Sequence, residues 1–246
     1  MAAGTEEDST ELARRLRDAD AETLLALVKD LASSLDVAAA RQALRNPFAG
    51  AELIEALLAV PSLVRYYEVQ RVIALHPRTP EVHALRLVPG LFWIDLVRLG
   101  LDTRVKPVVR RAADERLIER VPRLSVGERI AVARRASSAV LSHLRHDPTP
   151  RVIAALLENP RLTEGTLLPL LAGDASVPAV LAIIAQDPRW GTRYPVRVAL
   201  CRNPRTPVPT ALGLLPGLRK VDLGAVESDP RLAGAVRQRA QLLLGR

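Results

Sequence analysis

The sequence has few aromatic residues, one cysteine and no long apolar run. Phenylalanine, tyrosine and tryptophan make up 3% of the 246 residues although 48% are hydrophobic, so the core must be built from alanine, leucine and valine. That composition is typical of closely packed short helices. Strand-forming residues are not grouped in alternating runs, and no Asn-Gly or Asp-Gly hairpin turn separates apolar segments. We therefore expect an all-α protein.

The same scarcities exclude several kinds of site. Cys201 has no partner for a disulfide and one cysteine cannot by itself hold a metal, so we expect neither metal nor cofactor. No apolar run reaches the roughly 20 residues that span a bilayer. Residues 1–10 carry acidic side chains where a secretory signal carries basic ones, and no apolar segment follows them. These features predict a cytoplasmic protein without a membrane partner.

Lysine is also scarce, and the positive charge is carried by arginine. Lys29, Lys106 and Lys220 are the only lysines among 35 basic residues, and the net charge is +8. Arginine is suited to bidentate contacts with carboxylate or phosphate groups. The expected partner is another protein with an acidic surface, with nucleic acid as the alternative, and charge alone does not separate the two.

One motif occurs twice. Residues 76–80 read His-Pro-Arg-Thr-Pro and residues 203–207 read Asn-Pro-Arg-Thr-Pro, 127 positions later. The same offset, without a gap, aligns further identical residues, among them Leu87 with Leu214 and Asp95 with Asp222. Agreement over such a length predicts an internal repeat.

The repeated unit is a pair of helices separated by a proline turn. Residues before proline avoid the helical conformation and proline cannot continue a helix, so each turn ends one helix. The turns of the first kind are Asn46-Pro47, His76-Pro77, Val121-Pro122, Asn159-Pro160 and Asn203-Pro204, and those of the second kind are Asp102, Asp147-Pro148, Asp187-Pro188 and Asp229-Pro230. The first kind recurs at intervals of 30, 45, 38 and 44 residues, close to the length of two-helix repeats.

Hydroxyl residues after these turns are expected to begin the next helix. The predicted N-caps are Thr79, Ser125, Thr163 and Thr206. Ser125 with Glu128 has the spacing of a capping box. Pro80 and Pro207 are expected at the first helical position, where no N–H is needed.

This cycle of Asp-Pro turn, valine- and alanine-rich helix, Asn-Pro-Arg turn and paired-leucine helix resembles bacterial HEAT-like repeat proteins, most closely the leucine-rich repeat variant. The resemblance implies a right-handed α-solenoid of about five two-helix units over residues 36–246. Residues 1–35 are expected to form an acidic leader and an N-terminal helical cap. Relatives of this class can hold an iron–sulfur cluster on cysteines before the repeats, but this chain has no cysteine there.

Arginines at equivalent positions are the candidate binding residues. Arg78, Arg123, Arg161 and Arg205 share one repeat position and Arg104, Arg189 and Arg231 share another, which predicts two rows along the stacked units. A row can bind a partner, or it can be a structural ladder in which each arginine bonds the neighbouring repeat. We expect ladder contacts for Arg161 and Arg205, with Asp187 and Asp229 as acceptors. The cluster Arg189, Trp190 and Arg193 completes the candidate binding set.

Catalytic motifs are absent from the sequence, which favours a non-enzymatic protein-binding scaffold or adaptor of undetermined oligomeric state. His143 and His146 are spaced for a weak metal site, yet a helix end with ordinary dipole-compensating residues explains them better. The alternative function is a nucleic-acid-binding array. Small HEAT-like DNA glycosylases are basic helical proteins that use aromatic residues and an aspartate, a pattern to which Trp93, Asp95 and Trp190 are loosely similar.

Overall fold

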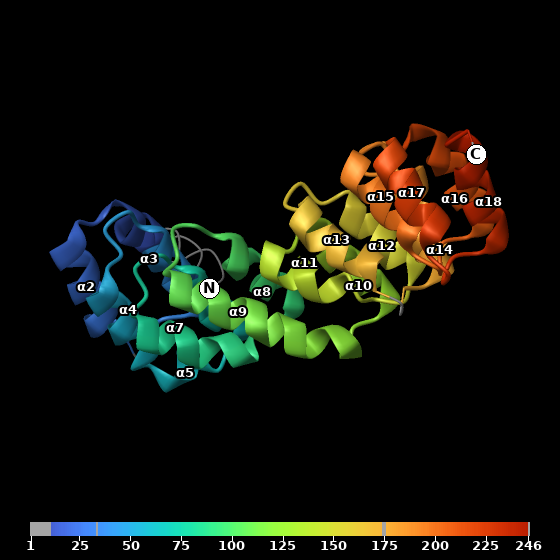
Figure 1. The fold of residues 1–246 in the computed structure, drawn as a ribbon. Helices are drawn as coiled ribbons and strands as arrows, with labels where there is room; N and C mark the ends of the chain where they lie inside the picture. The colour runs from blue at the N-terminus through green and yellow to red at the C-terminus, as the bar shows by residue number, and fades with distance from the viewer. Residues whose placement is uncertain (1–10, 33, 174–175, 246) are drawn as a thin grey trace. The chain divides into compact units, whose positions relative to one another are not determined.

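A computed structural model describes residues 11–32, 34–173 and 176–245 of the chain. All regular secondary structure in these residues is helical, and the helices are short (Figure 1). The all-α prediction is therefore confirmed. The predicted acidic leader, residues 1–9, lies outside the described residues.

The chain divides into two compact units, residues 1–119 and residues 120–246. The helices of the first unit are the helix 11–18, α2 (Ala21–Asp30), α3 (Val37–Arg45), α4 (Ala51–Leu58), α5 (Pro61–Val64), α6 (Tyr67–Leu75), α7 (Glu81–Leu87), the 3-10 turn η1 (Val88–Gly90), α8 (Trp93–Leu101) and α9 (Pro107–Arg120). Residues 11–35 share one buried core with residues up to Ile73. Packing of this kind is what an N-terminal helical cap requires. The predicted boundary between the cap and the repeats, at residue 35, stays a prediction.

The second unit has more regular helix packing. Its elements are η2 (Val121–Arg123), α10 (Val126–Arg135), α11 (Ser138–Leu144), α12 (Pro150–Leu157), α13 (Glu164–Ala172), α14 (Pro178–Gln186), α15 (Tyr194–Arg202), α16 (Val208–Leu214), η3 (Leu215–Gly217), α17 (Lys220–Ser228) and α18 (Gly234–Leu243). Most of its helices pack on second neighbours: α10 on α12 and α12 on α14 in one series, α11 on α13, α13 on α15 and α15 on α17 in the other (Figure 1). The helices thus form two layers, with successive pairs added side by side.

Two of the four predicted helix caps are present. The Ser125 hydroxyl accepts from the Glu128 N–H while the Glu128 carboxylate accepts from the Ser125 N–H, so the capping box is confirmed. Thr163 caps α13. The predicted caps at Thr79 and Thr206 are wrong: both side chains are buried and donate back to the preceding helix, to the Ile73 and Leu200 carbonyls.

The proline that follows each of these two threonines explains the difference. Pro80 and Pro207 stand at the N-cap positions of α7 and α16, one residue before the place predicted for them. The threonine is thereby moved out of reach of the new helix. Its hydroxyl instead donates a second hydrogen bond to a carbonyl at the end of the previous helix, since the Ile73 and Leu200 carbonyls also accept from the backbone N–H groups of His76 and Asn203.

Candidate binding grooves

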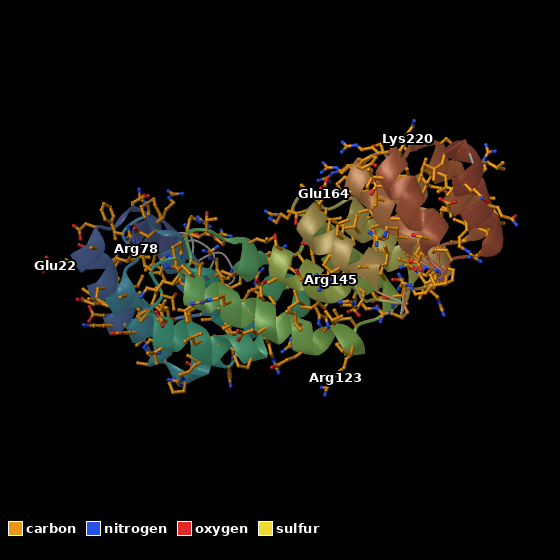
Figure 2. All side chains as sticks on the ribbon, in the orientation of Figure 1. Glu22, Arg78, Arg123, Arg145, Glu164 and Lys220 are labelled. Atoms are coloured by element: carbon orange, nitrogen blue, oxygen red, sulfur yellow. The ribbon has the colours of Figure 1, made fainter. Side chains whose placement is uncertain are left out.

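The four arginines of the first predicted row are all exposed. Arg78 Nη1 donates to the Pro47 and Ala49 carbonyls, at 2.9 and 3.2 Å. Within the described part of the chain, the guanidinium groups of Arg123, Arg161 and Arg205 form no hydrogen bond or ion pair. Arg123 extends away from its turn into solvent (Figure 2).

The second set of arginines is bonded within its own turns or to a neighbouring one. Arg104 Nε and Nη2 donate to the Asp102 carboxylate, at 3.0 and 2.7 Å, and Arg231 forms the same bidentate contact with Asp229. These contacts lower the pKa of both aspartates. Arg189 Nη1 instead donates to the Asn159 carbonyl at 3.3 Å. Arg189 therefore bonds the backbone of the turn that carries Arg161.

Trp190 is buried, with 1% of its surface exposed. Its indole Nε1 donates to the Leu157 carbonyl at 3.1 Å, and the guanidinium groups of Arg189 and Arg193 both lie 4.7 Å from the ring centroid. Arg193 also pairs with Glu164 at 2.7 Å. Of this predicted cluster, the surface therefore presents the two arginines, and Trp190 is the platform on which they stack.

A structural ladder exists, and asparagine forms it together with Arg78 and Arg189, whose guanidinium groups donate to carbonyls of neighbouring turns. Asn159 Nδ2 donates to the Ala133 and Ala136 carbonyls at the end of α10, and Asn203 Nδ2 donates to the Leu171 and Gly173 carbonyls at the end of α13. Asn46 does the same at the end of the helix 11–18. All three side chains are buried. Each asparagine turn thus caps the helix that precedes it in the stack.

The expected ladder contacts of Arg161 and Arg205 are therefore wrong. Asp187 accepts from the backbone N–H groups of Arg189 and Trp190, and Asp229 is held by Arg231. Asparagine can bond its own turn and a neighbouring helix at once, because its amide has both an acceptor and a donor. In Asn159, Oδ1 accepts from the Arg161 N–H, and Nδ2 donates to the end of α10.

Equivalent places in the two copies of the 127-residue repeat hold surface grooves. In the second unit the groove has a volume of about 590 Å³ and lies between α13 and α15. Its apolar lining residues are Leu168, Leu171, Ala172, Pro195, Val198, Ala199 and Pro204. Arg202 and Arg231 line it as well, and both are exposed. A volume of this size is within the range of ligand-binding sites.

Tyr194 and Asp222 also line this groove. The Tyr194 hydroxyl donates to Asp222 and accepts from the Arg219 N–H, and the Arg219 guanidinium stacks on the ring at 4.7 Å. Burial, followed by the bond to the Asp222 carboxylate, raises the pKa of Tyr194. Sequence reasoning missed this tyrosine, although the 127-residue alignment contained the signal.

The first copy repeats this tyrosine–aspartate contact. Tyr67 donates to Asp95 Oδ2 at 2.6 Å and accepts from the Phe92 N–H. Asp95 is 2% exposed and also pairs with Arg98 at 3.2 Å, while Trp93 beside it is half-buried. The two Tyr67 contacts join α6 to the start of α8, and the Arg98 pair lies within α8. They favour a structural role for Asp95.

The groove of the first unit is chemically different. It has a volume of about 530 Å³ and is lined by Arg45, Arg71, Arg78, Arg104 and His76, together with apolar residues of α3 and α6. Arg71 and Val72 stand where the second copy has Val198 and Ala199. The same place in the fold is therefore basic in one copy and mainly apolar in the other.

The remaining candidate groups offer little chemistry. His146 Nε2 accepts from Arg145 Nε at 3.0 Å, which occupies one nitrogen of the predicted weak metal pair. The part of the chain that the structure describes holds no group of three or more metal-ligating side chains. Burial raises the pKa of the Cys201 thiol to about 12, which makes it an unreactive core residue. None of the described helices is long and apolar enough to cross a membrane.

The charge is distributed unevenly between the two units. Residues 120–246 hold 19 arginines or lysines against nine aspartates or glutamates, whereas residues 1–119 hold 16 against 18. The second unit thus has a net charge of +10 and the first −2. The arginine excess predicted to attract an acidic partner belongs to the second unit.

Comparisons with known proteins add no identity to this geometry. No protein-family model, curated protein or solved structure matches the chain.

Proposed function

We propose that this protein is a non-enzymatic scaffold that binds another protein, built as a right-handed α-solenoid of the HEAT-like, leucine-rich-repeat-variant kind. Second-neighbour packing of α10 to α17 in two layers supports the solenoid. The asparagine contacts support it too, because each one joins a turn to the end of the preceding helix, as stacked repeats require.

The groove between α13 and α15 is the observation that carries the binding proposal. Its walls are leucine, valine, alanine and proline side chains, and it is open to solvent. Apolar side chains that line a groove gain free energy when a partner covers them, roughly 25 cal/mol for each Å² removed from water. Leu168 and Val198 are half-buried in the free chain and so are the surface that an apolar anchor would cover.

The arginines at the groove determine the charge of the partner that it would bind. Arg202 is exposed at the groove, and the unit around it has a net charge of +10. A segment with an apolar anchor beside one or more carboxylates would match both features. The positive field would speed its association, and the anchor would slow its release.

Nucleic acid is the second candidate, and one observation favours it. The exposed guanidinium groups of Arg123, Arg161 and Arg205 have no bonded partner within the described residues and could contact phosphates. A relationship to DNA glycosylases has weaker support, because Asp95 is buried and already bonded to Tyr67 and Arg98.

Selection from a random peptide display library against the full-length protein tests the first proposal. Selected peptides should pair leucine or phenylalanine with aspartate or glutamate. Leu168→Ser and Arg202→Glu should each weaken their binding about tenfold, the effect of losing a central apolar or charged contact. Arg239→Glu makes the same charge change on an exposed residue of α18 outside the groove and should have little effect.

Two results would contradict the peptide-binding proposal. The first is selection of peptides without acidic residues that bind the two groove variants as well as the parent. The second is tight binding of duplex or single-stranded nucleic acid that survives physiological salt, since nonspecific phosphate contacts weaken steeply with salt. The second result would favour the nucleic-acid alternative.

A further inference from the structure

The groove of the first unit has the composition of an anion site. Four arginines, Arg45, Arg71, Arg78 and Arg104, line one hollow of about 530 Å³. Among the described residues that line it there is no carboxylate. Asp95 pairs with Arg71 at 3.7 Å, and Asp102 pairs with Arg104. These two carboxylates balance two of the four arginines, so a net charge of two positive units remains.

Two of these arginines are held in place by the fold. The Pro47 and Ala49 carbonyls both accept from Nη1 of Arg78, which leaves its Nε and Nη2 donors available. Asp102 engages Nε and Nη2 of Arg104, which leaves its Nη1 donors. A guanidinium already fixed by protein contacts loses less freedom when it binds an oxyanion.

His76 adds a neutral donor to the groove. Its Nδ1 accepts from the Arg78 N–H at 3.2 Å, so the neutral ring carries its proton on Nε2. Burial, and then the charges of Arg78 and Arg104, lower the pKa of His76. Near neutral pH the ring therefore remains neutral and can donate one hydrogen bond to an anion.

Apolar side chains complete the walls of the groove. They are Leu44, Pro47, Ala49, Val72, Leu75 and Pro77. The volume exceeds what an inorganic ion fills, and it lies within the range of sites for small organic molecules. A ligand that matches the groove would combine an oxyanion with an apolar body.

We propose that the groove of α3 and α6 binds an organic phosphate monoester, with its phosphate among Arg45, Arg78, Arg104 and His76 and its body against Val72 and Leu75. The phosphate offers three acceptor oxygens and up to two negative charges, which suits several converging guanidinium donors. This site is independent of the peptide groove, because the equivalent position of the second copy has Asn203 in place of His76 and Val198 in place of Arg71.

Histidine NMR of the full-length protein provides the test. The chain has four histidines, so each imidazole signal can be followed while phenyl phosphate, inorganic phosphate or phenol is added at constant ionic strength. The His76 signals should move saturably with both phosphates, at lower concentration with phenyl phosphate, and stay in place with phenol. The His143 and His146 signals, from the second unit, should not move.

Three variants sharpen the test. Arg45→Gln removes an exposed arginine of the groove and should weaken phenyl phosphate binding about threefold, as expected for one solvated ionic contact. Asp102→Asn keeps the Oδ1 acceptor that holds the Arg104 N–H and Nε in place but removes the negative charge that competes for the guanidinium, so binding should tighten by about the same factor. Arg86→Gln, on exposed α7 outside this groove, is the matched control.

The proposal is overturned if phosphate moves the His76 signals no more than chloride does. It is also overturned if Arg45→Gln and Arg86→Gln alter binding equally, because the effect would then be general charge screening. Thermal melting of each variant establishes that it is folded, and Arg45→Gln, on an exposed side chain, is expected to melt like the parent. Movement of His76 with inorganic phosphate but no gain with phenyl phosphate would refute the organic-ligand proposal.

Discussion

Asparagine and aspartate before proline share one local contact in this chain and differ in the second. In both, Oδ1 accepts from the N–H two residues on, as in Asn203 with Arg205 and Asp229 with Arg231. Asparagine then donates to the end of an earlier helix in the stack, whereas aspartate has no donor: Asp147 and Asp229 pair with Arg129 and Arg231, and Asp187 accepts, among the described residues, from backbone N–H groups alone. Of the two residues, only asparagine can therefore donate a side-chain hydrogen bond to a neighbouring helix end.

Replacing Asn159 by alanine should destabilise the protein strongly. The side chain is 0% exposed and donates to the Ala133 and Ala136 carbonyls at 2.8 and 3.2 Å. Its loss leaves buried carbonyls and the Arg161 N–H without a partner, each at about 1–3 kcal/mol. We expect a decrease of about 2–4 kcal/mol in the free energy of unfolding, measured by urea denaturation.

Arg161→Gln is the control for this change, two residues along the same turn. Its side chain is exposed and bonds nothing within the described residues, so the free energy of unfolding should change by less than about 0.5 kcal/mol. A larger loss for Arg161→Gln than for Asn159→Ala would restore the arginine ladder and reject the asparagine one.

At the scale of helices and turns, the sequence predicted what depends on neighbours along the chain. The all-helical fold, the proline turns and the Ser125 capping box follow from local chemistry. The direction of the Thr79 and Thr206 hydroxyls did not, because a threonine before proline can bond forward or backward and the choice depends on burial. The Asn159 donor contact also escaped prediction, since its acceptors lie 26 and 23 residues away.

Glycine in the turn after α14 provides a prediction at the scale of an element. A Cβ on Gly191 would lie 2.1 Å from the Ala185 carbonyl oxygen and 2.8 Å from its carbon, and backbone atoms cannot move aside as a flexible side chain can. Gly191→Ala should therefore lower the free energy of unfolding by about 1–3 kcal/mol, the usual cost of overpacking. Thermal or urea denaturation measures the change.

Gly213 provides the opposite case within a helix. It is exposed in α16, and a Cβ there would meet no described atom within 4 Å. Gly213→Ala should raise the free energy of unfolding by about 0.5–1 kcal/mol, because alanine favours the helix and restricts the unfolded chain. Equal effects of the two substitutions would mean that the turn at Gly191 is less closely packed than the structure indicates.

For the whole molecule, the sequence predicted which arginines occupy equivalent positions, but it did not predict the composition of the grooves that they line. The 127-residue offset placed Arg104 and Arg231 at equivalent positions, and both grip an aspartate in the structure. It could not show that one groove is basic and its counterpart mainly apolar, because each groove combines residues far apart in the sequence, such as Leu44 of α3 with Arg104 of the turn after α8. Burial of Trp190 likewise depends on packing that no local pattern encodes.

Each compact unit contains a cluster of buried apolar residues that the other unit does not share, and this separation predicts where a substitution lowers stability. One core joins residues from Leu16 to Ile73 and another joins residues from Cys201 to Ala240. In stacked repeats each helix pair depends on its nearest neighbours, so a lost contact lowers stability first within its own stack. Local opening of this kind is detected by amide hydrogen exchange.

Asn46→Ala and Asn203→Ala make the same change in the two units, and exchange should separate their effects. Asn46 holds the end of the helix 11–18 and Asn203 the end of α13. We expect Asn46→Ala to speed exchange by tenfold or more, the factor for about 1.4 kcal/mol, in amides of residues 11–75. Asn203→Ala should do so in residues 164–245, with each variant leaving the other unit near the parent rate. Equal acceleration throughout the chain in both variants would mean that the protein opens as one cooperative body, contrary to the nearest-neighbour argument.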